Sequence, residues 1–420
     1  MSSYECRVGR IHADITTYRI LARMSWVATK LYNTAMWGAR VAWDDTGLIP
    51  SGYDLYKVVR ESPYFGLLPS VSSTYQGIQV GYDFRSWYAL RKIDKTANPP
   101  RFRNKNHMSS VTYFQTSFRF KNDTILLSVA KGLKNELGYP LRFLPLPNIR
   151  WNKAIPSNGI IKQLVFVPEN GYFNVHAKIL IPEPEWRING QVVAVDLGMR
   201  NPIVAIDEEG NIDIFKGGRI LSDLRYWNKE RSRVQSEIMR RSEGRNRNSN
   251  ALSRMAKHGS GQIEQAIHAM TSTFVELCNR RNVKEVVVGD LRGIKKNIDG
   301  TGKLWSDKCN QNWQQFPVRE IVIQLRYKLA RYGIKLIEQD EAGTSKGRCS
   351  ICGCTERSKL NRSHRGMFCC ENCGIQLNAD INGAGNQLAR YLRREHSQSS
   401  SGESATPSVY HWNDHHWIVV

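Results

Sequence analysis

Two closely spaced pairs of cysteines place the strongest constraint on how this chain folds. CSIC supplies Cys349 and Cys352, and CENC supplies Cys370 and Cys373 after seventeen intervening residues. Two Cys-x-x-Cys turns at this spacing are typical of a zinc ribbon, in which four thiolates surround one Zn²⁺. Because four thiolates fill the tetrahedral shell, we expect this zinc to be structural and not catalytic. The neighbouring cysteines that we expect to stay outside the zinc site are Cys354 and Cys369.

The chain is also strongly basic. Its 420 residues include 60 Lys and Arg against 38 Asp and Glu, a formal net charge of +22. A basic protein without a polyanionic partner is the plain alternative, but 11 Trp and 17 Tyr interleaved with the basic residues favour nucleic acid. No apolar span, amphipathic membrane helix or secretory signal is evident, so we expect an intracellular protein with no membrane partner.

The front of the chain is predicted to be a β module with a helical insertion. Residues 18–95 have apolar residues at mixed three and four spacing, which predicts helices that end before Pro99 and Pro100. After the basic loop PRFRNKN, the stretches VTYFQTSFRF, DTILLSV and LRFLPLP alternate as strands do. The segment IIKQLVFVPENGYFNVHAKILI predicts a hairpin that turns at residues 169–171.

The character of the sequence changes between Pro182 and Gly190. QVVAVDLGMRNPIVAIDEEGNIDIF predicts two or three strands, followed by a polar helix over residues 224–258 and an amphipathic helix that starts at Gly261. The strands EVVVGD and IKLIEQ come next with a helix between them, and DINGAGNQLARYLRR is a final helix after the cysteines. Antiparallel strands followed by strands added in parallel are the element order of an RNase H-like α/β domain. The low-complexity sequence from His396 predicts a flexible tail.

Two aspartates are candidate active-site residues. Asp196 ends an apolar strand, and Asp380 stands at the start of the last helix. Each alone is weak, because Asp often ends a strand in a turn or caps a helix. Together in a basic α/β domain they indicate metal-dependent phosphodiester cleavage, which uses three or four carboxylates around a pair of Mg²⁺ ions.

The third acid is missing from its simplest position. The central strand EVVVGD ends in Gly289 followed by Asp290. Neighbouring strands lie only about 4.8 Å apart, so a glutamate at the carboxyl end of IKLIEQ can reach the same metals, and Glu341 stands there. Asp290 is the alternative, although strand alternation turns its side chain away from the face of Gly289.

With these residues in place, the chain resembles the TnpB family of transposon-encoded RNA-guided DNA endonucleases and the related compact type V CRISPR effectors. The matching segments are PPRFRNKN, VVAVDLG, VVVGDLRGI, TSKGRCSICG and FCCENCGIQLNADINGAGN, and the resemblance runs from about residue 70 to residue 395. It implies a multi-domain α+β and α/β protein in the cytoplasm of a prokaryote, associated with the nucleoid. The implied parts are a wedge β-barrel (1–17 and 108–188), a helical recognition insertion (18–107), a RuvC nuclease domain (189–345 and 377–395), a zinc ribbon (346–376) and a flexible tail (396–420).

The resemblance also implies roles for the acids. Asp196 corresponds to the first RuvC acid and Asp380 to the last, whereas Gly289 stands where the usual middle glutamate would be. Some branches of the wider family have this glutamate just before the Thr-Ser that leads into the ribbon, and Glu341 precedes Thr344-Ser345. We prefer this rearranged site to an inactive one. Asn382 and Asn386 are candidates to orient phosphate or water.

Several residues are candidate nucleic-acid contacts. The family's recognition helix corresponds to the segment with Tyr75, Gln76 and Gln79, whose side chains suit base edges, although an ordinary helix surface explains them equally well. The basic loop after Pro100 suits phosphate contacts that position the protein without reading sequence. The arginine-rich stretch 225–257 is either a solvated helix face or a phosphate-facing surface. The loop residues that we expect to contact the backbone are Arg101, Arg103 and Lys105.

We therefore predict an RNA-guided, Mg²⁺-dependent DNA endonuclease that recognises a short motif beside its target and cleaves with Asp196, Glu341 and Asp380. Its partners would be a guide RNA and target double-stranded DNA, and it would act as a monomer or a homodimer. The main alternative is a nuclease-inactive RNA-guided DNA-binding repressor. An RNA-independent transposition accessory protein or zinc-ribbon transcription factor leaves the two aspartates unexplained.

Overall fold

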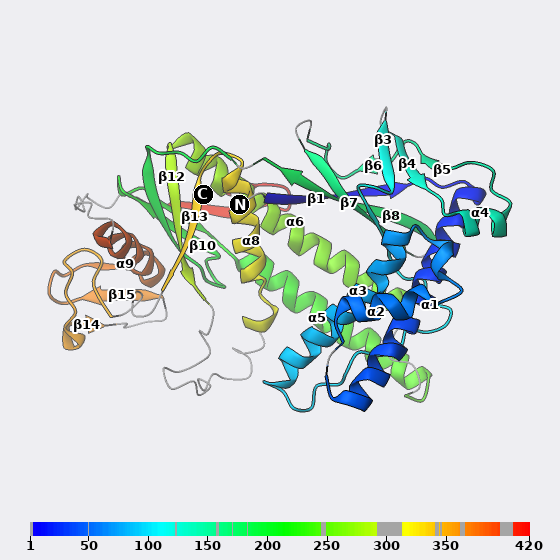
Figure 1. Cartoon of the computed structure of the whole chain (residues 1–420). Coiled ribbons are helices and arrows are strands. Elements are labelled where there is room, and N and C mark those ends of the chain that lie inside the picture. The colour runs from blue at the N-terminus through cyan, green and yellow to red at the C-terminus, as the bar shows by residue number, and fades with distance from the viewer. Residues whose placement is uncertain are drawn as a thin grey trace. The chain divides into compact units, whose positions relative to one another are not determined.

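The structure, a computed structural model, consists of two compact units, Met1–Glu183 and Pro184–Val420 (Figure 1). The expected multi-domain α+β architecture is therefore confirmed. No helix among the described residues is long and apolar enough to cross a membrane. The structure describes residues 3–48, 50–121, 124–156, 159–169, 171–182, 184–244, 249–291, 313–340, 344, 347–361, 366–394 and 406–420.

The first unit is built on an antiparallel sheet of five strands, in the order β2-β7-β8-β1-β6. The predicted hairpin is present: β7 and β8 pair from Ile160↔Leu180 to Glu169↔Tyr172. The first strand of the chain pairs along its whole length with β8, so it lies inside the sheet although the other four strands follow the helices in the sequence. The strand bounds are Ser3–Ile11 (β1), Val111–Phe114 (β2), Arg150–Trp151 (β6), Ile160–Glu169 (β7) and Tyr172–Ile181 (β8).

A second sheet of three strands completes the β part of this unit. Its strands β3 (Phe118–Lys121), β4 (Thr124–Ser128) and β5 (Phe143–Leu146) pair antiparallel, and the short helix α4 (Lys131–Leu137) joins the last two. Ile125 and Leu127 on β4 are fully buried. Alternate residues of the predicted strands therefore supply one face of the core, as the period of two requires.

The helical insertion between β1 and β2 has three α-helices. They are α1 (Ile15–Thr46), α2 (Gly52–Arg60) and α3 (Ser70–Arg91), with a 3₁₀ turn, η1, at Phe65–Leu67. The helix α1 ends where Gly47 adopts a left-handed conformation with φ of 64°. Ser51 then starts α2 with a capping box to Asp54. Local capping chemistry thus divides a region whose apolar periodicity is nearly continuous.

The second unit contains a mixed sheet of seven strands, in the order β13-β12-β9-β10-β11-β17-β18. The strands β9, β10 and β11 are antiparallel, while β12 and β13 are added parallel to β9. Their near-continuous apolar sequences are those of strands covered on both faces. The bounds are Gln191–Asp196 (β9), Ile203–Asp207 (β10), Ile212–Phe215 (β11), Val283–Asp290 (β12) and Lys335–Asp340 (β13).

Helices cover both faces of this sheet (Figure 1). The helices α6 (Asn250–Arg280) and α8 (Val318–Ala330) pack on the face that carries Val193, Val195, Val286 and Val288. The last helix, α9 (Ala379–Arg394), packs on the opposite face through Leu388, Tyr391 and Leu392. Alternation along β9 and β12 therefore decides which residues lie beneath α9.

The end of the chain differs from the expected flexible tail. Ser408–Trp412 (β17) pairs in parallel with β11, and Trp417–Val419 (β18) pairs with β17. The ring of Tyr410 stacks on Phe215 at 4.5 Å, and the indole of Trp417 donates a hydrogen bond to the carbonyl of Ala266. The prediction of a tail that is flexible through residue 420 is therefore wrong for these strands, because the packing of their aromatic side chains offsets the entropy lost when the strands are ordered.

The boundary between α5 (Gly218–Arg241) and α6 also differs from the prediction. The prediction separated the two helices between residues 258 and 261, but α6 runs through both positions; α5 ends at Arg241, and α6 begins at Asn250 with Ser249 as its cap. Gly259 lies against Trp227 of α5, and a Cβ there would be 2.6 Å from the indole ring. This glycine therefore permits close helix packing and does not end a helix.

The two glycines of α6 give a matched test of this packing. We expect Gly259→Ala to destabilise the protein by about 1–3 kcal/mol, because the added methyl overpacks the contact with Trp227. Gly261→Ala, with nothing within 4 Å of its Cβ position, should instead stabilise by about 0.5–1 kcal/mol through helix propensity. Thermal unfolding of the full chain measures both shifts. Equal shifts for the two variants would contradict this account.

Candidate active site and zinc ribbon

The four predicted zinc ligands converge. The Sγ atoms of Cys349 and Cys373 are 3.8 Å apart, those of Cys352 and Cys370 are 3.7 Å apart, and all four lie within 4.8 Å of one another. Tetrahedral Zn–S bonds of about 2.3 Å separate thiolates by about 3.8 Å. The donor set and its spacing therefore fit Zn²⁺.

The local fold explains this convergence. Each pair sits on a turn that is followed by a glycine with positive φ, 71° at Gly353 and 70° at Gly374. The backbone N–H of Cys354 lowers the pKa of Cys352 to about 6, whereas burial raises the pKa of Cys349 to about 12. Cys354 and Cys369 are outside the cluster, as expected. The strands of the ribbon are Leu360–Asn361 (β14), Met367–Cys370 (β15) and Gln376–Asn378 (β16), with a 3₁₀ turn, η2, at Arg357–Lys359.

Asp196 is the last residue of β9 and is buried, with 6 % of its surface exposed. It shares its face of the strand with Val192 and Ala194, which pack against α9. A Cβ added to Gly383 of α9 would lie 2.9 Å from Oδ2 of Asp196 and 3.1 Å from its Cγ. The carboxylate therefore lies directly against the helix backbone, and a larger residue at 383 would displace it.

Asp380 stands in the first turn of α9, one turn before Gly383. Its Oδ2 accepts a hydrogen bond from the side-chain amide of Asn201 at 2.7 Å, and its backbone N–H donates to Oδ1 of Asn378 at 2.8 Å. Residues three apart share a helix face, so Asp380 and the contact of Gly383 with Asp196 are on the same side of α9. The structure thus brings together the two aspartates that lie 184 residues apart in the sequence.

Asn201 was not identified from the sequence. It is buried in the loop between β9 and β10, and its carbonyl accepts a hydrogen bond from the N–H of Gly198 at 3.2 Å. An asparagine in a short connection usually indicates only a turn. The signal that could have found it is its position five residues after Asp196, in the loop that leaves the same strand end.

The register of the central strands places Gly289 beside Asp196. Val288 pairs with Val195, so Gly289 is next in line beside Asp196, and Gly289 pairs with Gln339 on its other side. Gly289 shares the α9 face with Val287, whereas Asp290 follows Val286 and Val288 onto the opposite face. Alternation therefore turns Asp290 away from Asp196, as predicted. Glu341 lies outside the described residues.

Buried amides lie on the strand next to Gly289 and on α9. The Nε2 of Gln339 donates to the carbonyl of Gln387 on α9 at 2.8 Å. The Oε1 of Gln339, both polar side-chain atoms of Gln387 and the Oδ1 of Asn386 have no hydrogen-bond partner among the described residues. All three side chains are at least 95 % buried. Such groups are uncommon in native proteins and indicate a place for water, an ion or another polar group.

The side-chain amides of Asn382 and Asn386 make backbone contacts that were not predicted from the sequence. The side-chain amide of Asn382 donates to the carbonyl of Arg348, and its Oδ1 accepts from the N–H of Ser350, both at 2.8 Å. Asn386 donates to the carbonyls of Thr344 and Arg348 at 2.8 and 2.7 Å. These amides therefore attach the approach to the zinc ribbon to α9.

The residues predicted to read bases lie on α3 and are not equally accessible. Tyr75 is half-buried with its ring edge against Phe114, and Gln79 donates to Asp83 at 2.9 Å. Gln76 is only 3 % exposed, so the structure does not support a direct contact from this side chain to a base. Tyr75 and Gln79 stay predictions.

The three basic residues of the loop after Pro100 also differ in exposure. Arg101 and Lys105 are exposed, as a phosphate contact requires. Arg103 is half-buried: its guanidinium lies 3.5 Å from the ring centre of Tyr32 and donates to Ser109 at 2.8 Å. Burial lowers the pKa of Arg103 from its ordinary value, although the Tyr32 hydroxyl and Asp83 oppose this shift. Its position predicts that it holds the loop to α1.

Comparisons with known proteins match the order of these parts. Residues 175–295 match the model of a probable transposase, OrfB_IS605, and residues 319–387 match the Cas12f1-like TNB domain. The family resemblance is confirmed. The chain is 23 % identical over 405 residues to a putative RNA-guided DNA endonuclease of Streptomyces pristinaespiralis, with 92 % of this chain and 88 % of that protein covered. It is similar in fold to the protein in the cryo-EM structure of a Cas12f1–sgRNA–target DNA complex, with a TM-score of 0.53, 13 % identity and coverage of 89 % and 82 % of the two chains.

The matched TNB segment contains all four cysteines and most of α9, and zinc removal tests the ligand set directly. We expect one zinc per chain by elemental analysis, and its loss in Cys370→Ala, because three thiolates cannot complete the structural shell. Residues 347–378 should then become sensitive to limited proteolysis. Cys354→Ala is the matched control and should keep its zinc. Retention of zinc by Cys370→Ala would exclude this ligand set.

Asn201→Ala tests the support of Asp380. Loss of the amide donor leaves Oδ2 of the half-buried Asp380 without this partner, and partners of this kind typically contribute about 10–100-fold to metal affinity. We therefore expect the Mg²⁺ concentration that gives half-maximal DNA cleavage to rise by about that factor. Asn211→Ala, which removes a similar amide from Asp207 at the other end of the sheet, is the control. An unchanged Mg²⁺ dependence in Asn201→Ala would show that the hydrogen bond is dispensable.

Proposed function

We propose that this protein is an RNA-guided DNA endonuclease that cleaves DNA with Asp196, Glu341 and Asp380. The observation that carries the proposal is the contact of α9 with β9, in which the helix turn that carries Asp380 lies at the carboxyl end of β9, beside Asp196. The relative named as an RNA-guided DNA endonuclease, which aligns over nearly the whole of both chains, supports this activity.

The second unit would be an RNase H-like RuvC domain interrupted by the zinc ribbon, and the two sheets of the first unit would form a wedge β-barrel. Strand order supports the RuvC assignment: β9–β11 are antiparallel, and β12 and β13 extend the sheet in parallel from β9. The ribbon enters after β13 and leaves into α9. The helices α1–α3 would be the recognition insertion that meets the motif beside the target.

The carboxylates would hold Mg²⁺, for which oxygen ligands are suited. When bound, Mg²⁺ would activate water and stabilise the leaving oxygen of the phosphodiester. The protein's own part is to fix the carboxylates: strand β9 holds Asp196, and Asn201 orients Asp380 through one oxygen. The buried amides of Gln339 and Gln387 provide further polar groups beside them.

Glu341 is the proposed third acid. Ile337 and Gln339, four and two residues before it, have their side chains on the α9 face of β13, the face of Asp196. Asp290 belongs to the alternate set of β12 that packs toward α6 and α8. Strand alternation therefore favours Glu341 over Asp290.

Guide RNA and target DNA would be bound by the basic surface. On α5, Arg225, Lys229, Arg231 and Arg240 are exposed, while three other arginines pair with acids of the same helix. Exposed Arg101 and Lys105 would add phosphate contacts in the first unit. Because such binding releases counterions from nucleic acid, affinity should fall steeply with salt.

Substitution of the acids tests the proposal. The protein is purified with co-expressed RNA and given a guided DNA target with Mg²⁺. Asp196→Ala, Glu341→Ala and Asp380→Ala should each lower the cleavage rate by at least about 100-fold, because each removes several kcal/mol of metal-supported charge stabilisation. Guided target binding, measured by gel shift, should remain.

Asp290→Ala is the matched control and should cut at close to the normal rate. Cutting that survives Glu341→Ala but not Asp290→Ala would assign the third acid to Asp290. A wild-type protein that binds its guided target but cuts none would contradict the endonuclease proposal and favour a guided DNA-binding repressor.

A further inference from the structure

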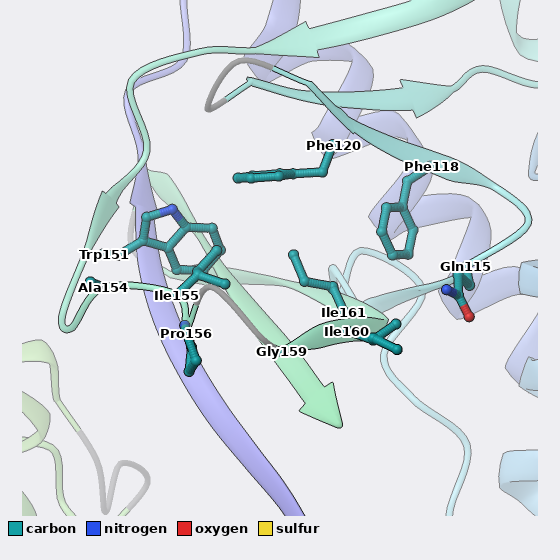
Figure 2. A pocket seen from close by; sticks show the side chains of 10 residues that line it. All are labelled: Gln115, Phe118, Phe120, Trp151, Ala154, Ile155, Pro156, Gly159, Ile160 and Ile161. Carbon is teal, nitrogen blue, oxygen red and sulfur yellow. The ribbon is translucent and has the colours of Figure 1, made fainter. Parts of the chain in front are cut away.

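A cavity of about 740 Å³ opens between the two sheets of the first unit (Figure 2). Strands β3, β6 and β7 and the segment that follows β6 supply its walls. This volume is within the range of about 300–1,000 Å³ that is usual for small-molecule sites. The lining is mainly apolar and aromatic, with Gln115 as its polar side chain: Phe118, Phe120, Trp151, Ala154, Ile155, Pro156, Gly159, Ile160 and Ile161.

Three aromatic rings dominate the cavity. Figure 2 shows Trp151 and Phe118 on opposite sides, with Phe120 reaching between them. Phe118 is 8 % exposed, whereas Phe120 is 42 % exposed. The cavity therefore presents an accessible aromatic surface, unlike a hydrophobic core, in which such rings are buried. Exposed aromatic side chains can bind flat aromatic ligands by stacking.

Trp151 is fixed in place by the neighbouring strand. It pairs with Gly9 of β1, and a Cβ on Gly9 would lie 2.8 Å from Cε3 and 3.1 Å from Cδ2 of the indole. The indole therefore rests on the backbone of β1. A ring held in this way loses little conformational entropy when a ligand binds, which favours affinity.

The charge around the cavity identifies the class of ligand. The segments 115–121, 150–156 and 159–162 carry five basic residues and no acidic residue; strand alternation turns Arg119, Lys121 and Arg150 to the face opposite the cavity, so Lys153 and Lys162 are the rim residues. Lys162 donates to Oε1 of Gln115 at 3.3 Å, so the amide nitrogen of Gln115 remains available as a donor at the wall. The basic residues of these segments are Arg119, Lys121, Arg150, Lys153 and Lys162.

We propose that this cavity binds an unpaired nucleobase of the guide RNA, stacked on Trp151 and Phe120, with its flanking phosphates on the basic rim. The inference rests on the proposed RNA-guided function and adds a binding site for a single-stranded or bulged position of that RNA. Bases inside a duplex are stacked on one another, so an aromatic pocket takes a base that has been turned out of the stack. Stacking tolerates any base, while a donor at Gln115 favours a base with an acceptor on its exposed edge.

Crosslinking gives the direct test. The full chain is purified with co-expressed RNA and irradiated with ultraviolet light, and the peptides that carry nucleotides are identified by mass spectrometry. We expect crosslinks on the peptides that contain Trp151 and Phe118–Phe120. RNA that is bound but crosslinked only elsewhere would overturn this inference and leave the proposed function intact. Absence of bound RNA would contradict both.

Affinity measurements separate stacking from charge. The gel-purified RNA is bound again to each protein in filter-binding assays. Trp151→Ala and Phe120→Ala should each weaken binding about 5- to 150-fold, the range for one base stacked on an aromatic ring, with little change in salt dependence. Lys153→Gln should reduce the salt dependence because it removes a phosphate contact.

Two variants control for folding and for general aromatic content. Trp151→Phe keeps a stacking surface and should recover most of the affinity lost in Trp151→Ala. Tyr4→Ala removes a ring that is 51 % exposed on β1 and outside the cavity, and should bind normally. Wild-type affinity in both Trp151→Ala and Phe120→Ala, or an equal loss in Tyr4→Ala, would contradict the pocket.

Discussion

The close contact between Gly383 and the carboxylate of Asp196 is the constraint on which the candidate site depends. Strand β9 fixes one acid, helix α9 carries the other, and only the carboxylate of Asp196 lies between the strand and the helix backbone at Gly383. A Cβ at 383 would displace this carboxylate from its position beside the turn that carries Asp380. Catalytic geometry must hold to within a fraction of an ångström. The position of the Asp196 carboxylate therefore depends on the absence of a side chain at 383.

The zinc ribbon takes part in the same constraint. The chain leaves β13 for the ribbon and returns from it directly into α9, so the ribbon determines how the helix begins. Asn382 and Asn386 bind the backbone on the way into the ribbon, at Thr344, Arg348 and Ser350. Four thiolates and two asparagines thus fix the start of α9 from both sides. A structural metal far from any reacting atom can in this way position the last acid.

Local sequence patterns predicted most of the strands, the hairpin of β7 and β8 and the zinc ligands, because alternation and Cys-x-x-Cys spacing are complete within short segments. They failed where the partner is distant in the sequence. Gly259 looks like a helix end in the sequence, but it packs against Trp227 within a helix. Ser408–Trp412 looks like part of a flexible tail, but it is ordered by packing against Phe215. Asn201 could not be distinguished from an ordinary turn residue without the position of Asp380. In each case tertiary contact overrode the local preference.

Gly289 leaves a gap in the strand end beside Asp196 that the proposed rearranged site would use. It stands in a row between Asp196 and Gln339, on the face that α9 covers. On the neighbouring strand and on α9, four buried amide atoms of Gln339, Asn386 and Gln387 have no partner among the described residues, and each such atom costs about 1–3 kcal/mol. A strand end that had merely lost its glutamate would be stabilised by apolar side chains here. Polar groups at this place are instead what the proposed rearranged site would need, because Glu341 would require both room and hydrogen-bond partners there.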